Sequence, residues 1–168
     1  MRSRTVIDSA VGPLTLVAQD GAIVGLYMDT QRHRPDDDVL GVPDRLGREA
    51  EQFKAAADQL DAYFAGALTR FTLSLAPRGS QFQQRVWAAL QDIPYGGTES
   101  YGELAARIGS PGAARAVGLA NGKNPIGIII PCHRVLGSHG SLTGYGGGLD
   151  RKKQLLDLER AVSGGALF

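Results

Sequence analysis

The hydrophobic pattern of this 168-residue chain changes its period near residue 77. Before the segment 76–79, short apolar runs alternate with turn residues, which is typical of β-strands. After this segment, apolar residues recur at helical spacing between capping residues. We therefore predict an α+β fold with two parts: an N-terminal α/β domain of residues 1–76 and a mostly α-helical C-terminal domain of residues 77–168.

The N-terminal part is predicted to contain a small antiparallel sheet. Its β-rich runs lie at residues 5–7, 14–18 and 23–28. Asp20-Gly21, between the last two runs, is a strong signal for a β-hairpin. Residues 71–75 alternate between apolar and polar, so we expect a further, half-buried strand there.

One helix and one loop complete this part. Apolar residues at helical spacing predict a helix over residues 46–64, with Gly66 as its C-cap. Residues 30–43 are polar and contain proline, and we expect an exposed loop there.

The C-terminal part contains the pattern of a helix-turn-helix motif. Ser100 and Glu103 form a capping box at the start of one short helix. A turn at 110–112 separates it from a second short helix, expected over residues 113–121. Many helical hairpins bind nothing, so the pattern alone is compatible with a DNA-binding motif and with a helical pair that has no ligand.

Charge is balanced over the whole chain but not along it. Residues 1–75 carry a net charge of −3 and residues 76–168 a net charge of +4. The second predicted helix of the motif is slim and rich in alanine, and Arg115 and Lys123 give it positive charge. This asymmetry makes the C-terminal part the candidate for a polyanionic partner, although uneven surface charge also occurs without function.

The cysteine count limits the chemistry. Cys132 is the only cysteine and there are three histidines, which excludes an intramolecular disulfide and a cysteine-rich metal site. We expect no metal. The longest apolar run, 126–130, is far too short to span a membrane, and the N-terminus does not resemble a signal peptide. We therefore expect a soluble protein in the cytoplasm.

Cys132-His133 is the pair that could perform chemistry. A thiol is a nucleophile precursor at neutral pH, and imidazole is the commonest base. The proline-bracketed segment 124–131 is expected to be extended and to deliver Cys132 from the interior. Neighbouring side chains of an extended segment point to opposite faces, so the sequence does not guarantee direct contact between Cys132 and His133, and a water molecule could bridge them. The alternative is a buried, inert cysteine.

Several motifs resemble the O6-alkylguanine-DNA alkyltransferase family, DNA-repair proteins that transfer an alkyl group from guanine to their own cysteine. These motifs are Phe82-Gln83-Gln84-Arg85-Val86-Trp87, Ile93-Pro94-Tyr95-Gly96, Ser100-Tyr101-Gly102, Ala113-Ala114-Arg115-Ala116-Val117-Gly118, Asn124-Pro125, Ile130-Pro131-Cys132-His133-Arg134-Val135 and Leu142-Thr143-Gly144-Tyr145-Gly146-Gly147-Gly148-Leu149. The resemblance covers residues 79–159 closely, and residues 1–78 only in layout. It implies an RNase H-like N-terminal domain.

The resemblance also implies a role for each matching residue. Cys132 would accept the alkyl group, with His133 as its base through a water molecule and Glu159 orienting the imidazole. Asn124 would brace the turn that presents the cysteine, and the Tyr101 hydroxyl would stabilise the leaving guanine. The substrate pocket would be lined by Asn121, Val135, Tyr145, Gly146 and Gly147. The resulting thioether is stable, so each molecule would act once, without a cofactor.

The partner implied by the resemblance is double-stranded DNA that contains an alkylated base. The second helix of the motif would enter the minor groove, and Arg115 would occupy the place of the flipped base. The DNA-binding residues would be Tyr101, Gly102, Ser110, Ala114, Arg115, Lys123 and Ser138. A monomer is expected without DNA, and the sequence leaves open whether several molecules bind side by side.

Two other functions are compatible with parts of the sequence. A lesion-binding protein without catalysis would share the fold, but the presence of Cys132 argues against it. A cysteine hydrolase could use Cys132 and His133, but such pairs are rarely adjacent in sequence and the basic helix-turn-helix would stay unexplained.

Overall fold

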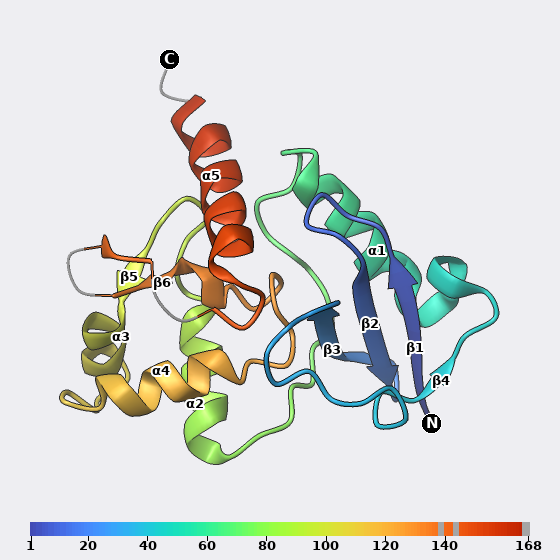
Figure 1. Cartoon of the computed structure of the whole chain (residues 1–168), viewed down its shortest axis with the longest axis horizontal. Coiled ribbons are helices and arrows are strands. Elements are labelled where there is room, and N and C mark those ends of the chain that lie inside the picture. Colours follow the sequence, from blue (N-terminus) through green and yellow to red (C-terminus); the bar gives the residue numbers. More distant parts are fainter. Residues whose placement is uncertain (138–139, 143–144, 166–168) are drawn as a thin grey trace.

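The computed structural model describes residues 1–137, 140–142 and 145–165. A strand-rich first part of the chain stands beside a helical second part (Figure 1). The expected α+β architecture is therefore confirmed. Among the described residues, none of the helices combines the length and apolar character that crossing a lipid bilayer requires.

The sheet of the first part is mixed rather than purely antiparallel. Strands β1 (Arg2–Ile7), β2 (Leu14–Gln19) and β3 (Ala22–Met28) form an antiparallel meander. The short strand β4 (Val42–Pro43) lies at the other edge and pairs with β1 in parallel, giving the order β3-β2-β1-β4. The predicted Asp20-Gly21 hairpin is confirmed, and both residues have positive φ, as a type I′ turn requires.

The loop before β4 is tied to β1 by arginine side chains. Arg2 donates to the Val39 carbonyl at 2.9 Å, and Arg4 donates to the Gly41 carbonyl at 2.8 Å. These bonds bring the chain back along β1, which explains why a segment expected to be only loop ends in a parallel strand.

Helix α1 (Glu51–Phe64) packs on the sheet and begins later than predicted. Ala50 is extended, so residues 47–49 form a separate 3-10 turn, η1 (Gly47–Glu49). At the other end, Gly66 adopts φ +75° and donates to the Tyr63 carbonyl, while the amide of Ala67 donates to Ala62. These bonds form a Schellman motif, so the predicted C-cap is confirmed.

The predicted strand at residues 71–75 is wrong. The segment makes only an isolated parallel bridge, between Leu75 and Ile23, with the Ile23 amide donating to Ser74 at 2.9 Å. Further back, the Thr72 amide donates to the side chain of Gln59 on α1 at 2.9 Å. A side chain thus takes the place of a neighbouring strand, which the alternating pattern cannot reveal.

The second part is built from helices and one very short sheet. Its elements are α2 (Gln81–Leu90), β5 (Glu99–Ser100), α3 (Tyr101–Arg107), α4 (Ala114–Gly122), the 3-10 turn η2 (Cys132–Arg134), β6 (Val135–Leu136) and α5 (Leu149–Gly165). Capping boxes start α2 at Ser80 and α3 at Ser100. Helices α3 and α4 form the predicted helix-turn-helix, and Trp87 of α2 anchors it by donating to the Ala120 carbonyl at 2.9 Å.

The segment 124–131 is a series of tight turns, so the expected extended conformation is wrong. Ile128 has φ +70°, and the Ile130 amide donates to the Ile126 carbonyl at 3.0 Å. Asn124 holds the series together through its side chain. Its Nδ2 donates to the Ile130 carbonyl at 2.8 Å, and its Oδ1 accepts from the backbone amide of Ile126 at 3.0 Å. Turns let this apolar segment bury its isoleucines between the two parts while Asn124 satisfies their backbone groups.

Candidate functional site

Cys132 is the first residue of η2 and lies almost completely in the interior, at 6% exposure. The Asn121 side chain donates to its carbonyl at 3.3 Å. Burial raises the pKa of the Cys132 thiol, while a hydrogen bond with Asn124 and the positive charge of Lys152 oppose this rise. The resting sulfur is therefore a thiol, and nucleophilic attack needs a base to remove its proton.

His133 provides a base with a defined orientation. The residue is fully buried, and its Nε2 lies 2.7 Å from Oε2 of Glu159. Burial raises the pKa of Glu159, but the hydrogen bonds from His133 and Arg134, together with the charge of Arg134, outweigh burial and lower this pKa to about 2. Since an ionised carboxylate only accepts, Nε2 carries the proton and donates a hydrogen bond to Glu159. Nδ1 is then the basic nitrogen, and it has no hydrogen-bond partner among the described residues.

The imidazole is neutral at pH 7. Desolvation lowers the pKa of His133, Glu159 raises it, and the charges of Arg134 and Lys152 lower it further. Arg134 also binds the carboxylate directly, with Nε 2.8 Å from Oε1 and Nη2 3.1 Å from Oε2 of Glu159. The carboxylate charge is thus compensated by a permanent cation, which leaves His133 free to accept a proton.

Lys152 on α5 is a second buried cation close to the thiol. It has no exposed surface, and its ammonium donates to the Val135 carbonyl at 2.6 Å. Burial lowers the pKa of Lys152 to about 8, although attraction to Cys132 opposes this shift. An ammonium at this place favours the thiolate over the thiol.

Three members of this cluster, Arg134, Lys152 and Tyr63, were not among the site residues predicted from the sequence. Arg134 adjoins the Cys-His pair, and Lys152 shares a face of α5 with Glu159 at i, i+7 spacing, so both left a weak signal. Tyr63 left none, because it belongs to the other part of the chain.

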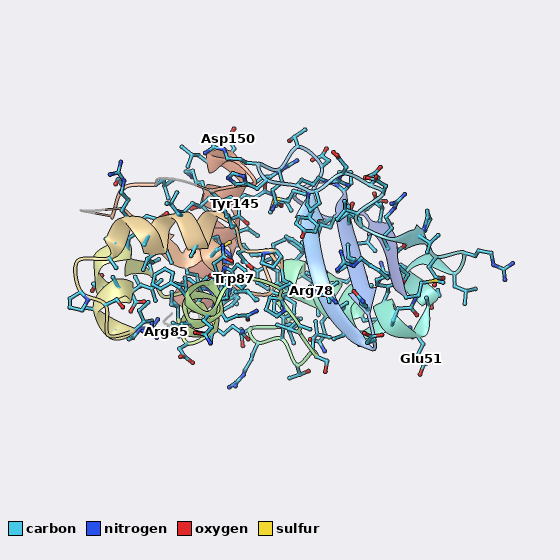
Figure 2. All side chains as sticks on the ribbon, turned by 90° about the horizontal axis from the view of Figure 1, so that it is seen from below. Glu51, Arg78, Arg85, Trp87, Tyr145 and Asp150 are labelled. Atoms are coloured by element: carbon cyan, nitrogen blue, oxygen red, sulfur yellow. The ribbon has the colours of Figure 1, made fainter. Side chains whose placement is uncertain are left out.

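Of the residues predicted to line the substrate pocket, Asn121 is in hydrogen-bond contact with the backbone of Cys132. The predicted pocket residues are Asn121, Val135, Tyr145, Gly146 and Gly147, and the first three are buried. Tyr145 and Trp87 lie in the helical part on the side that faces the sheet (Figure 2). The glycine-rich segment that contains Gly146 and Gly147 contacts the first part of the chain, because the Arg32 amide donates to the Gly146 carbonyl at 2.7 Å. A Cβ at Gly147 would overlap with the Met28 sulfur, so any larger residue here would require the Met28 side chain to move.

A hollow of about 700 Å³ opens between the helix-turn-helix and the chain that follows Cys132. Four of the predicted DNA-binding residues line it: Tyr101, Gly102, Ala114 and Arg115. Arg115 is exposed and makes no ion pair among the described residues. Ser110 and Lys123 lie on the same motif but do not line the hollow, and Ser138 lies outside the described residues.

The pKa of Glu159 predicts that acid destabilises the fold. A carboxyl pKa held at about 2, against 4.5 for a free group, contributes about 3 kcal/mol of stability that is present above pH 4.5 and lost between pH 4.5 and 2. Urea unfolding of the protein at pH values from 7 to 3 measures this loss. The exposed Asp157 pairs with Lys153 on the same helix, so Asp157→Asn should keep the same pH dependence. A stability that stays constant below pH 4.5 would contradict the assignment.

Comparison with known proteins agrees with this geometry. Residues 81–161 match the family described as 6-O-methylguanine DNA methyltransferase, DNA binding domain, and residues 3–77 match its ribonuclease-like domain. The chain is 55% identical to a methylated-DNA–protein-cysteine methyltransferase of Mycolicibacterium paratuberculosis, covering 96% of this chain and 94% of the relative. It is 48% identical to a protein of the same name from Methanosarcina acetivorans, over 92% and 96% of the two chains.

A solved structure gives the same result. The crystal structure of Mycobacterium tuberculosis OGT in complex with DNA superposes with a TM-score of 0.89 at 54% identity, covering 95% of this chain and 94% of that chain. The two family matches together extend over both parts of the chain, including η2 and the helix-turn-helix. The protein therefore belongs to the 6-O-methylguanine DNA methyltransferase family.

Proposed function

We propose that this protein repairs DNA by transferring the alkyl group of O6-alkylguanine irreversibly to the sulfur of Cys132. The observation that carries the proposal is the arrangement of the adjacent His133. Its Nε2 is bound to Glu159 at 2.7 Å, while Nδ1 is left as a buried base on the residue next to the sole cysteine. The function matches the names of relatives at 55% and 48% identity.

The reaction is a displacement at a saturated carbon. His133 removes the thiol proton through a water molecule, and the sulfur attacks the alkyl carbon. The bond between that carbon and the guanine oxygen breaks, and its electrons move to the guanine. The guanine then takes up a proton in place of the alkyl group. The charge of Lys152 favours the thiolate, and Asn124 holds the turn that presents Cys132. A thioether remains, so each molecule reacts once.

DNA is the partner, and the helix-turn-helix supplies the surface that binds it. We propose that α4 enters the minor groove, because its small residues allow a close approach, and that Arg115 fills the place of the flipped base. Tyr101 would stabilise the leaving base from the hollow, and Gly102, Ser110 and Ser138 would bind phosphates. Lys123 and Ala114 would lie along the groove. O4-alkylthymine is proposed as a second substrate.

Three further features stay predictions from the sequence: the domain boundary between residues 76 and 77, a monomeric state without DNA and a cytoplasmic location. Cooperative binding of several molecules along DNA is a proposal of the same kind.

Mass spectrometry tests the proposed transfer. Incubation with a duplex containing one O6-methylguanine should add one methylene to the protein, and peptide mapping should locate it on Cys132. Cys132→Ala should gain no mass while it still binds the duplex. Binding of the duplex by the unaltered protein without a gain in mass would instead indicate a lesion-binding protein. If the protein neither binds the duplex nor gains mass, the DNA-repair function is overturned.

A further inference from the structure

The catalytic cluster receives one hydrogen bond from the N-terminal part of the chain. Tyr63, in the last turn of α1, donates from its hydroxyl to Oε2 of Glu159 at 2.6 Å, across 96 positions of sequence. The Tyr63 side chain is fully buried. Its ring lies edge-on to Tyr95 at 6.2 Å and tilted against Phe71 at 5.4 Å, which fixes the direction of the hydroxyl.

The direction of this hydrogen bond is unambiguous. Burial and the neighbouring Glu159 charge raise the pKa of Tyr63, so the phenol keeps its proton. The carboxylate of Glu159 has none to give, because its pKa is lowered to about 2. Tyr63 is therefore the donor.

Three donors share one carboxylate oxygen. Oε2 of Glu159 accepts from Tyr63 at 2.6 Å, from His133 at 2.7 Å and from Arg134 Nη2 at 3.1 Å. Each donor withdraws charge from the same oxygen, so the contact that would stabilise a protonated His133 is weaker than in an isolated pair. The hydroxyl of Tyr63 thus acts on the base of the reaction through Glu159.

We infer that Tyr63 is a positioning residue for alkyl transfer, through which the N-terminal part orients Glu159 and keeps His133 neutral and able to accept the thiol proton. The inference deepens the proposed function and rests on it. The N-terminal part then does more than support the fold, since it supplies one donor of the catalytic cluster.

The effect of Tyr63 has to be separated from that of the other groups near His133. Glu159 and Lys152 face it from α5, Arg134 and Cys132 from η2, and Tyr95 acts on Glu159 from the segment after α2. Of these, Glu159 is the group in hydrogen-bond contact with both His133 and Tyr63. Tyr63→Phe removes the hydroxyl and leaves the ring and all the other groups in place.

The pH dependence of the transfer rate tests the inference. Without the hydroxyl, Glu159 stabilises protonated His133 more strongly, so the acid limb of the rate profile of Tyr63→Phe should move to higher pH by roughly one unit. Tyr27→Phe is the matched control, since it removes a buried phenol hydroxyl from the core cluster of Val17, Val24 and Leu40 in the same part of the chain. Its profile should not move.

A double-mutant comparison tests the route through the carboxylate. In a Glu159→Gln background, adding Tyr63→Phe should move the acid limb no further. An acid limb that does not move in Tyr63→Phe alone, or a rate lowered by the same factor at every pH, would overturn the inference and leave Tyr63 a packing residue.

Nuclear magnetic resonance gives a readout that does not need the reaction. The imidazole nitrogens of the free protein, with His133 assigned by His133→Gln, should titrate at higher pH in Tyr63→Phe than in the unaltered protein. If the protein transfers no alkyl group but this titration shifts, the proposed function fails while the coupling of Tyr63 to His133 stands. Titration at the same pH in both proteins would overturn that coupling.

Discussion

Glu159→Gln is expected to lower the free energy of unfolding by about 3–5 kcal/mol and to slow alkyl transfer by about 10²–10⁴-fold. The carboxylate is 1% exposed and accepts from Arg134, His133 and Tyr63. An amide of the same shape has one oxygen and one nitrogen, and the nitrogen cannot accept. Arg134 is 7% exposed and would keep its charge without a compensating anion, which is the costly outcome for a buried ion pair.

The two effects of this substitution can be measured separately. Urea unfolding at pH 7 measures the loss of stability, and single-turnover methyl transfer at a temperature where the variant is folded measures the loss of rate. Asp157→Asn removes an exposed carboxylate of the same helix and should change the unfolding free energy by less than about 0.5 kcal/mol. A Glu159→Gln protein that is as stable as the unaltered one would mean that Arg134 is not held by this carboxylate.

Arg115→Ala is expected to lower the rate of transfer from duplex DNA by about a hundredfold while leaving the reaction with free O6-methylguanine base unchanged. The exposed arginine lines the hollow beside the helix-turn-helix, whereas the catalytic cluster is buried on η2 and α5 and does not line it. Removing a base from the stack costs a few kcal/mol, and a side chain that fills the gap offsets part of this cost. The free base needs no such step.

A matched arginine distinguishes base flipping from general attraction to DNA. Arg160 is exposed on α5 and lines neither this hollow nor the catalytic cluster, so Arg160→Ala should react with duplex DNA at the normal rate. An equal loss in both variants would indicate only a loss of positive charge. An equal loss with duplex and with free base in Arg115→Ala would place Arg115 in the chemistry instead of in the DNA step.

Features that depend on neighbouring residues were predictable from the sequence. The Asp20-Gly21 turn, the capping box at Ser100 and the glycine after α1 all follow from local backbone preferences, and the structure confirms each of them. Two predictions were wrong where a side chain binds the backbone in place of the expected partner. Residues 71–75 are not a strand, because Gln59 binds their backbone, and residues 124–131 are not extended, because Asn124 folds them into turns.

The candidate site divides in the same way. The sequence by itself determined that the single thiol can form neither an intramolecular disulfide nor a cysteine-rich metal site. The resemblance of the motif around Cys132 pointed to His133 and Glu159. Only the tertiary structure decided the state of that base. It brings Arg134, Lys152 and, from the other part of the chain, Tyr63 into one buried cluster, where they set the charge around His133. Protonation depends on burial and on charges a few ångströms away, and neither can be deduced from spacing along the chain.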